Sequence, residues 1–207
     1  MSLTVRVRVP ASSANLGPGF DCLALALDLW SEVDFSIAPR GIHLTYCGEG
    51  KEFIRLDETN LVTRAALAVF ERLGKPIPGL RIACRNDIPI GGGLGSSAAA
   101  VLSGLLGANA LLENPLTTRQ VLDMAAEMEG HPDNAAASLH GGLVVVISRG
   151  TSFQSVRFDL PPLSVALVVP DVFLPTKVAR AVLPKQVPMC DAVFNLGRAA
   201  LVVQALA

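Results

Sequence analysis

Apolar and polar residues alternate in several stretches of the chain, and this pattern predicts strands. The first stretch, residues 4–9, sets three valines between threonine and arginine side chains, and we expect this half-buried strand to end at Pro10. Similar patterns predict a pair of strands over residues 22–37 and single strands over 42–46 and 80–84. A continuous apolar, mostly β-branched run from Leu143 to Ile147 predicts a central strand.

Other segments show helical spacing of their apolar residues. A helix is predicted to start at Asn60 and to stop where a glycine and a proline follow, at residues 74–76. Small residues from Ser96 towards Leu112 predict a second helix, and the threonines at 117 and 118 offer the N-cap of a third that ends at Gly130.

One internal boundary is predicted, at the pair Pro161–Pro162. After it we expect a strand over residues 165–169, a short helix over 177–182 and a final helix from Asp191. These elements are too few to bury a core of their own, so we expect the chain to be cut short within a second domain. The alternative is a last helix that frays at a natural terminus.

Composition narrows the class of protein. Hydrophobic residues make up 51% and charged residues 17%, which is enough for a core, and the net charge of −1 argues against a nucleic-acid partner. The four cysteines form no CxxC pair, so we expect buried free thiols in a reducing cytoplasm. The uncharged residues 88–112 are long enough to span a bilayer, but a glycine loop leading into a buried helix explains them better, and we expect no membrane partner.

The stretch PIGGGLGSSAAA, from residue 89, has the composition of a phosphate-binding loop that lacks a lysine. Its glycines let backbone amides approach a ligand, and a helix beginning at the serines would direct its positive end to the same place. Mg²⁺ would then supply the missing positive charge, with the hydroxyl of Ser97 as one ligand. The alternative, a glycine loop that only permits tight packing, is equally compatible with this stretch alone.

Two further stretches carry polar groups at predicted bends. PASSANLGPGFD, from Pro10 to Asp21, is long for a turn and favours a ligand-contacting loop, although an elaborate turn remains the alternative. EGHPDN, from Glu129 to Asn134, has a proline suited to a helix start. Its carboxylate and polar side chains would suit magnesium and a polar substrate, or would simply cap the helix.

The order of these three motifs, together with TKVARAVLP from residue 176, resembles the GHMP kinases and, among them, most of all the homoserine kinases. The resemblance implies an α+β fold in two layers. Residues 1–160 would form the ATP-binding N-terminal domain, and residues 161–207 the start of a truncated, ferredoxin-like second domain. It also implies transfer of the γ-phosphoryl group of ATP to the side-chain hydroxyl of L-homoserine, in threonine biosynthesis, by a cytoplasmic enzyme that could be a homodimer.

The resemblance also assigns roles to residues. Mg²⁺ would be held by Ser97 and Glu129, and ATP would contact Asn60, Pro89, Ile90, Gly91, Gly92, Gly93, Leu94, Gly95, Ser96 and Ser97. The substrate would contact Asn15, Asp21, His131 and Arg180, with Asp21 at its ammonium group and Arg180 at its carboxylate.

Asp133 and Asn134 would take catalytic roles, and whether Asp133 acts as a base stays open. The rival interpretations are a kinase for mevalonate or a sugar and a non-catalytic binding module with the same fold.

Overall fold

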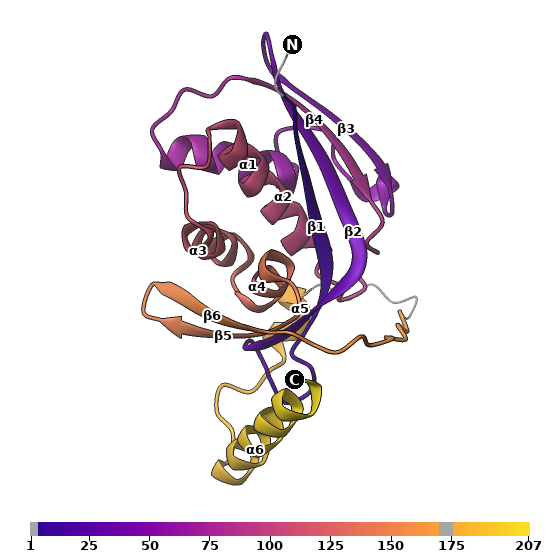
Figure 1. Ribbon diagram of the computed structural model, residues 1–207, viewed down its shortest axis with the longest axis vertical. Helices are drawn as coiled ribbons and strands as arrows, with labels where there is room; N and C mark the ends of the chain where they lie inside the picture. Colours follow the sequence, from indigo (N-terminus) through magenta and orange to yellow (C-terminus); the bar gives the residue numbers. More distant parts are fainter. Residues whose placement is uncertain (1–3, 170–175) are drawn as a thin grey trace.

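The computed structural model describes residues 4–169 and 176–207. Within them, a six-stranded sheet is covered on one face by the helices α1 to α4 (Figure 1). This arrangement confirms the predicted α+β class with two layers. The sheet order is β3-β4-β2-β5-β6, and β1 pairs with β2 off that path. The strands are β1 (Thr4–Ala14), β2 (Leu23–Ala38), β3 (Ile42–Gly48), β4 (Gly79–Asn86), β5 (Leu143–Arg149) and β6 (Ser152–Phe158).

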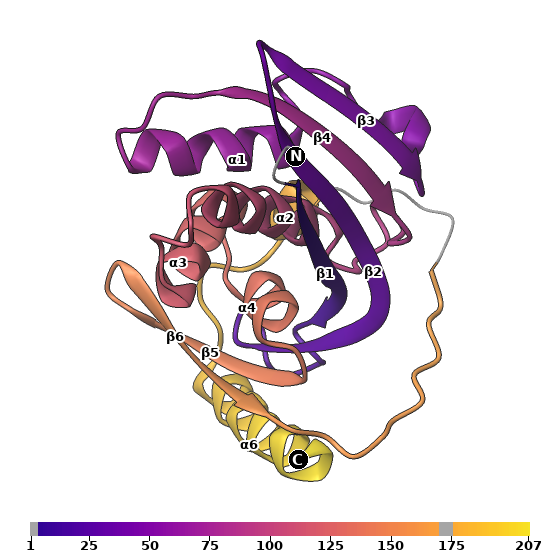
Figure 2. The ribbon, with the colours of Figure 1, turned by 45° about the horizontal axis from the view of Figure 1, so that its top comes forward.

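Strand pairing is antiparallel throughout the sheet except between β3 and β4, which are parallel. The helices α1 (Leu61–Arg72), α2 (Ser96–Leu111), α3 (Thr118–Glu129) and α4 (Asp133–His140) lie side by side over the sheet in two views (Figures 1 and 2). A short 3₁₀ helix, η1 (Lys51–Phe53), and two later helices, α5 (Thr176–Ala181) and α6 (Met189–Leu206), complete the described elements.

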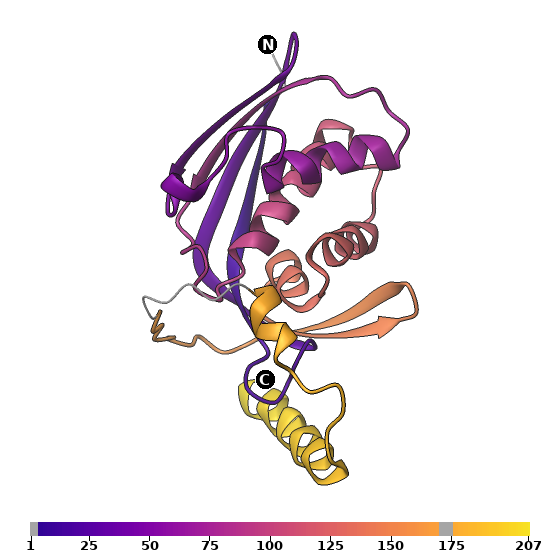
Figure 3. The same cartoon turned by 180° about the vertical axis from the view of Figure 1, so that it is seen from behind.

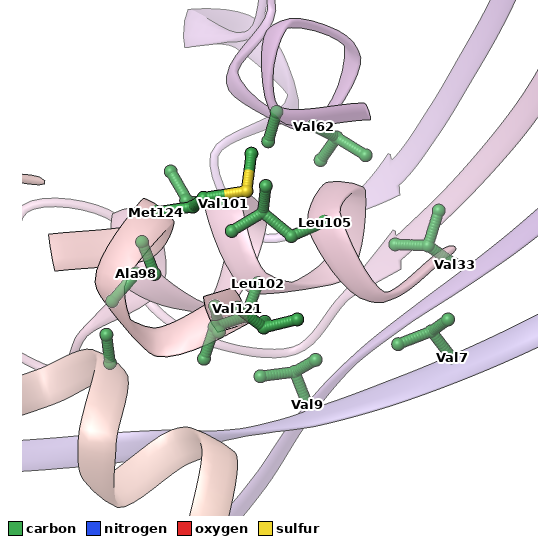
Figure 4. Packing of buried hydrophobic residues seen from close by; sticks show 14 of the residues in the cluster. Val7, Val9, Val33, Val62, Ala98, Val101, Leu102, Leu105, Val121 and Met124 are labelled. Atoms are coloured by element: carbon green, nitrogen blue, oxygen red, sulfur yellow. The ribbon is translucent and has the colours of Figure 1, made fainter. Parts of the chain in front are cut away.

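The core lies between the sheet and α2. Leu102 and Leu105 of α2 are fully buried and face Val9 of β1 and Val33 of β2, while α1 and α3 flank α2 (Figure 4). At Gly104, an added Cβ would lie 2.2 Å from the carbonyl oxygen of Val62, so α1 approaches α2 closely only because this residue is glycine. The expected buried helix after the glycine loop is therefore confirmed.

Helix ends follow the predicted signals. The Asn60 side chain accepts a hydrogen bond of 2.9 Å from the amide of Val62 and caps α1. Thr117 forms a capping box with Gln120 at the start of α3, and Gly130 ends α3 in the left-handed conformation, with φ of 82°.

Three predictions about strands are wrong. β1 continues past Pro10 to Ala14, because the register shifts between Pro10 and Ala11 and a bulge lets pairing with β2 resume. Residues 22–37 form one strand, β2, instead of a pair, since β1 pairs along one edge while β4 and β5 share the other. Residues 165–169 carry neither helix nor strand in the described chain and are exposed, so the predicted strand has no partner there. The sequence also gave no signal for β6, whose alternation is mostly polar.

The burial of the cysteines also differs from expectation. Cys84 is buried, whereas Cys22 is half-buried and Cys47 and Cys190 are exposed; all four are free thiols. The expected burial of all four thiols is wrong because Cys47 lies near the end of β3, which has β4 as its one partner among the described strands, and Cys190 lies on α6.

The last helix of the described chain lies apart from the two layers. The helix α6 extends away from the sheet (Figures 1 and 3), and no residue of it is buried. It begins at Met189, two residues before the predicted start at Asp191. Among the described residues it is the one helix long and apolar enough to cross a membrane by length and composition, with a mean hydropathy of 1.3 over 18 residues. α2, the other apolar helix, is shorter.

Candidate active site

A cavity of about 340 Å³ lies where the loop between β4 and α2 meets the start of α4. Its size is typical of a small-molecule site. Of the residues predicted to contact ATP, all except Gly92 line it. His131 and Asn134 line the same cavity from the start of α4, so the glycine loop and the EGHPDN motif meet at one place.

The N-terminus of α2 opens into this cavity. Its N-cap is Gly95, with φ of 70°, and in the described chain no side chain caps the helix, in contrast to α1 and α3. Free amides and the helix dipole therefore favour an anion here. Glycine is required at position 95, because a Cβ would lie 2.4 Å from Oγ of Ser12 and would sit on a backbone with positive φ.

Ser97 and Glu129 are brought together from different helices. The Ser97 hydroxyl donates a hydrogen bond of 2.5 Å to Oε2 of Glu129. The pair brings two oxygen ligands together, and among the described residues no group of three or more His, Cys, Asp or Glu side chains could hold a metal. This donor set fits Mg²⁺, which is usually held by one or two protein oxygens, water and substrate phosphates.

His131 and Asp133 form a pair at the start of α4. Nδ1 of His131 lies 2.8 Å from Oδ1 of Asp133, and that oxygen also accepts a 2.8 Å hydrogen bond from the amide of Asn134. The hydrogen bond with Asp133 raises the pKa of His131 above its ordinary value, against the opposing effect of burial. Asp133 is 1% exposed and lies outside the set of described residues that line the cavity, so it meets the site through His131.

Asp21 and Arg180 form an ion pair across 159 residues. Nη1 of Arg180 donates a hydrogen bond of 3.0 Å to Oδ2 of Asp21, and Nη2 donates a second to Oδ1. The guanidinium also lies over the ring of Phe20, 5.3 Å from its centroid. The pKa of Arg180 is raised, chiefly by its hydrogen bond to Asp21.

The loop that carries Asp21 has an unusual backbone. Asn15, Leu16 and Asp21 all have positive φ, of 66°, 44° and 56°. Such values are costly for residues other than glycine and are found at functional sites. The side chain of Asn15 stabilises the bend, because its Oδ1 accepts a hydrogen bond of 2.9 Å from the amide of Asp21.

The ion pair lies close to the His131–Asp133 pair. The positive charge of Arg180 partly opposes the rise that Asp133 causes in the pKa of His131, and the negative charge of Asp133 adds a small part to the raised pKa of Arg180. Asn15, Asp21 and Arg180 do not appear among the described residues that line the cavity. The predicted substrate residues therefore form two neighbouring groups, one inside the cavity and one beside it.

Asn60 is placed differently from the other predicted ATP contacts. It lines the cavity, but its side chain is 9% exposed and is engaged with the amide of Val62 and, at 3.0 Å, with the carbonyl of Arg55. In the structure, Asn60 acts as the N-cap of α1.

Tyr46, Cys84 and Asn86, which come from β3 and β4, are among the cavity residues that the sequence did not reveal. Burial raises the pKa of the Cys84 thiol to about 12. Asn86 bonds to both the carbonyl and the amide of Ile88, at 2.8 and 3.2 Å, and so shapes the entry to the glycine loop. The one signal in the sequence for these residues was Asn86 itself, an asparagine at the end of a strand just before the glycine loop.

Comparison with known proteins places these features in a family. Residues 60–142 match the family model of the GHMP kinases N terminal domain. A homoserine kinase of Streptomyces coelicolor is 46% identical over 210 residues, covering 98% of this chain and 67% of the relative. One of Streptomyces avermitilis is 45% identical, with coverages of 98% and 68%. The crystal structure of homoserine kinase from Cytophaga hutchinsonii superposes with a TM-score of 0.82 at 32% identity, covering 98% of this chain and 67% of that one. The chain thus spans about two thirds of the length of these relatives.

Proposed function

The chain belongs to the homoserine kinases of the GHMP kinase family, and from this membership we propose that it transfers the γ-phosphoryl group of ATP to the side-chain hydroxyl of L-homoserine. The observation that carries the proposal is the uncapped N-terminus of α2, which opens into a cavity shared with Ser97, His131 and Asn134. A nucleoside triphosphate needs a site for its anionic phosphates and ligands for its metal ion, which here would be Ser97 and Glu129.

In this proposal the phosphates of ATP lie against residues 91–97, and Asn60 lies near the base. Ser97 and Glu129 would hold Mg²⁺, which supplies positive charge to the phosphates in place of a lysine. The fixed amides of the helix terminus need no reorganisation as charge develops on the transferred group.

L-homoserine would bind through the Asp21–Arg180 pair. Its ammonium group would contact Asp21, supported by Asn15, and its carboxylate would contact the planar fork of Arg180. His131 and Asn134 would then contact the reacting hydroxyl inside the cavity. A zwitterion matches this site because it offers one group of each sign to two side chains that otherwise neutralise each other.

The chemistry we propose is positioning and charge stabilisation, as in phosphoryl transfer generally. Asn134 is the catalytic group that lines the cavity. Asp133 would act through His131, since its Oδ1 holds the imidazole at 2.8 Å and the carboxyl group is buried. A role for Asp133 as the base stays a prediction.

We further propose that residues 1–160 form the ATP-binding domain and that residues 161–207 begin a second one. The burial pattern supports this boundary, because no residue of α6 is buried. A cytoplasmic location and a small-molecule substrate fit this biosynthetic role.

Product formation tests the proposal directly. The purified protein would be given MgATP with L-homoserine, mevalonate or galactose in parallel, and phosphorylation of L-homoserine alone is expected. Turnover of another alcohol would overturn the substrate while keeping the family. A non-catalytic module is tested by thermal unfolding, since saturation with MgATP at about 100 Kd stabilises a binding-competent fold by roughly 2.7 kcal/mol.

A further inference from the structure

Ser12 is a fully buried polar residue at the centre of the site, with 0% exposure. It follows the register shift between Pro10 and Ala11 in β1, and bulges of this kind redirect side chains near active sites. Its hydroxyl lies 3.2 Å from the carbonyl of Asn134, 3.1 Å from Nδ2 of Asn134 and 2.9 Å from Oγ of Ser138.

These contacts fix the direction of every hydrogen bond in the cluster. The carbonyl of Asn134 can only accept, so Ser12 donates its one proton there. The amide of Asn134 and the hydroxyl of Ser138 then donate to the two lone pairs of Ser12.

The same contacts fix the orientation of the Asn134 side chain. Its amide nitrogen also donates to the backbone carbonyl of Ser12 at 3.2 Å, a partner that could not pair with an oxygen. The nitrogen end is therefore held by Ser12. The other end, Oδ1, has no hydrogen-bond partner among the described residues, and Asn134 lines the cavity. Oδ1 is thus an acceptor left unpaired within the described chain, on a residue that lines the cavity, and its chemistry suits the hydroxyl proton of a substrate alcohol.

Ser12 also joins this side chain to the glycine loop. The amide of Ser12 donates a hydrogen bond of 3.0 Å to the carbonyl of Leu94, next to the N-cap of α2. A Cβ at Gly95 would meet both Oγ of Ser12 and, at 3.1 Å, Nδ2 of Asn134. Ser12 therefore contacts both the loop that would hold phosphate and the Asn134 side chain that would hold the alcohol.

We propose that Ser12 is a positioning residue: it holds the Asn134 amide with Oδ1 towards the cavity and keeps it in register with the glycine loop. The inference rests on the proposed function for the identity of the alcohol. Because in-line transfer is sensitive to the placement of the acceptor, loss of this register should misplace the alcohol more than the nucleotide.

The test compares Ser12→Ala with Ser138→Ala, which removes another buried hydroxyl of the same cluster but leaves all three contacts between Ser12 and Asn134. Each variant is given MgATP and L-homoserine, and ADP and phosphorylated product are measured together. Ser12→Ala should lower kcat on the order of 10- to 100-fold, keep the KM for ATP within about 2-fold, and raise the ratio of ADP to product as water replaces the alcohol. Ser138→Ala should keep the wild-type ratio. Equal ratios in the two variants would overturn the proposal.

A second measurement uses the wild-type protein alone and does not depend on enzymatic activity. In the wild-type protein, the side-chain amide protons of Asn134 should exchange slowly with solvent by NMR, because Ser12 accepts from that nitrogen twice. Fast exchange of both protons would contradict the orientation. Absence of product from the wild-type protein would count against the proposed function alone, since the NMR result does not depend on it.

Discussion

Ser97 is the second residue of α2 and Glu129 is the last residue of α3, yet Oγ of Ser97 lies 2.5 Å from Oε2 of Glu129. The contact sets a carboxylate beside the positive end of α2, whose first amides are uncapped in the described chain. A carboxylate in that place stabilises the helix end by itself, and with a metal it would turn a weak anion site into a site for a charged nucleotide.

Removal of either member of this pair should impair metal-dependent turnover. Ser97→Ala and Glu129→Gln are each expected to lower kcat on the order of 100-fold and to raise the Mg²⁺ concentration needed for half-maximal rate. The control is Glu127→Gln, which changes an exposed carboxylate on the same helix. Titration of the rate with MgCl₂ gives the result, and an unchanged kcat in Ser97→Ala would exclude the magnesium assignment.

The Asp21–Arg180 pair should decide selectivity for a zwitterion. Asp21→Asn removes the partner of the ammonium group, so the KM for L-homoserine is expected to rise about 10-fold or more. The preference for L-homoserine over γ-hydroxybutyrate, which lacks the ammonium group, should shrink by a similar factor. Asp34→Asn is a matched control, because it breaks the exposed bidentate pair with Arg6 on the sheet. Equal preference in Asp21→Asn and the wild type would contradict this role.

The sequence predicted which motifs form the site, but it predicted less well which of their residues contact one another. Ser97 and Glu129 were expected to share a ligand, and they are in contact. Asp21 and Arg180 were predicted to bind opposite ends of a substrate. In the structure they bind each other, because opposite charges this close attract one another. Ser12 could not be singled out, because its importance comes from a bulge and from contacts 122 and 126 residues away. Strand boundaries failed for the same reason: β2 owes its length to neighbours on both sides.

The pKa values of His131 and His140 should be shifted in opposite directions. The hydrogen bond that Nδ1 of His131 donates to Asp133 raises the pKa of His131 above 6.5, whereas burial lowers that of His140 below it. Two-dimensional NMR of the imidazoles across pH 5 to about 9 should show this order, and Asp133→Asn should lower the pKa of His131 while leaving His140 unchanged.

The same shift fixes the pH dependence of stability. Because the folded-state pKa of His131 is raised, the pair contributes its full stabilisation below about pH 6.5 and loses it as pH rises through the folded-state pKa. Urea unfolding of the wild type and His131→Gln should therefore differ most at acid pH. A difference that grows with increasing pH would contradict the pairing.

Gly95 and Gly93 offer a matched test of the glycine loop, because both have φ of 70° but only Gly95 is crowded. Gly93→Ala meets nothing within 4 Å and should lower the free energy of unfolding by about 1 kcal/mol, the cost of a left-handed backbone. Gly95→Ala adds an overlap with Ser12 and should cost about 2–4 kcal/mol in total. It should also weaken MgATP binding, because relief of the overlap moves the N-terminus of α2. Urea unfolding and calorimetric titration with MgATP measure the two effects, and equal losses in the two variants would show that contact with Ser12 does not set the position of the loop.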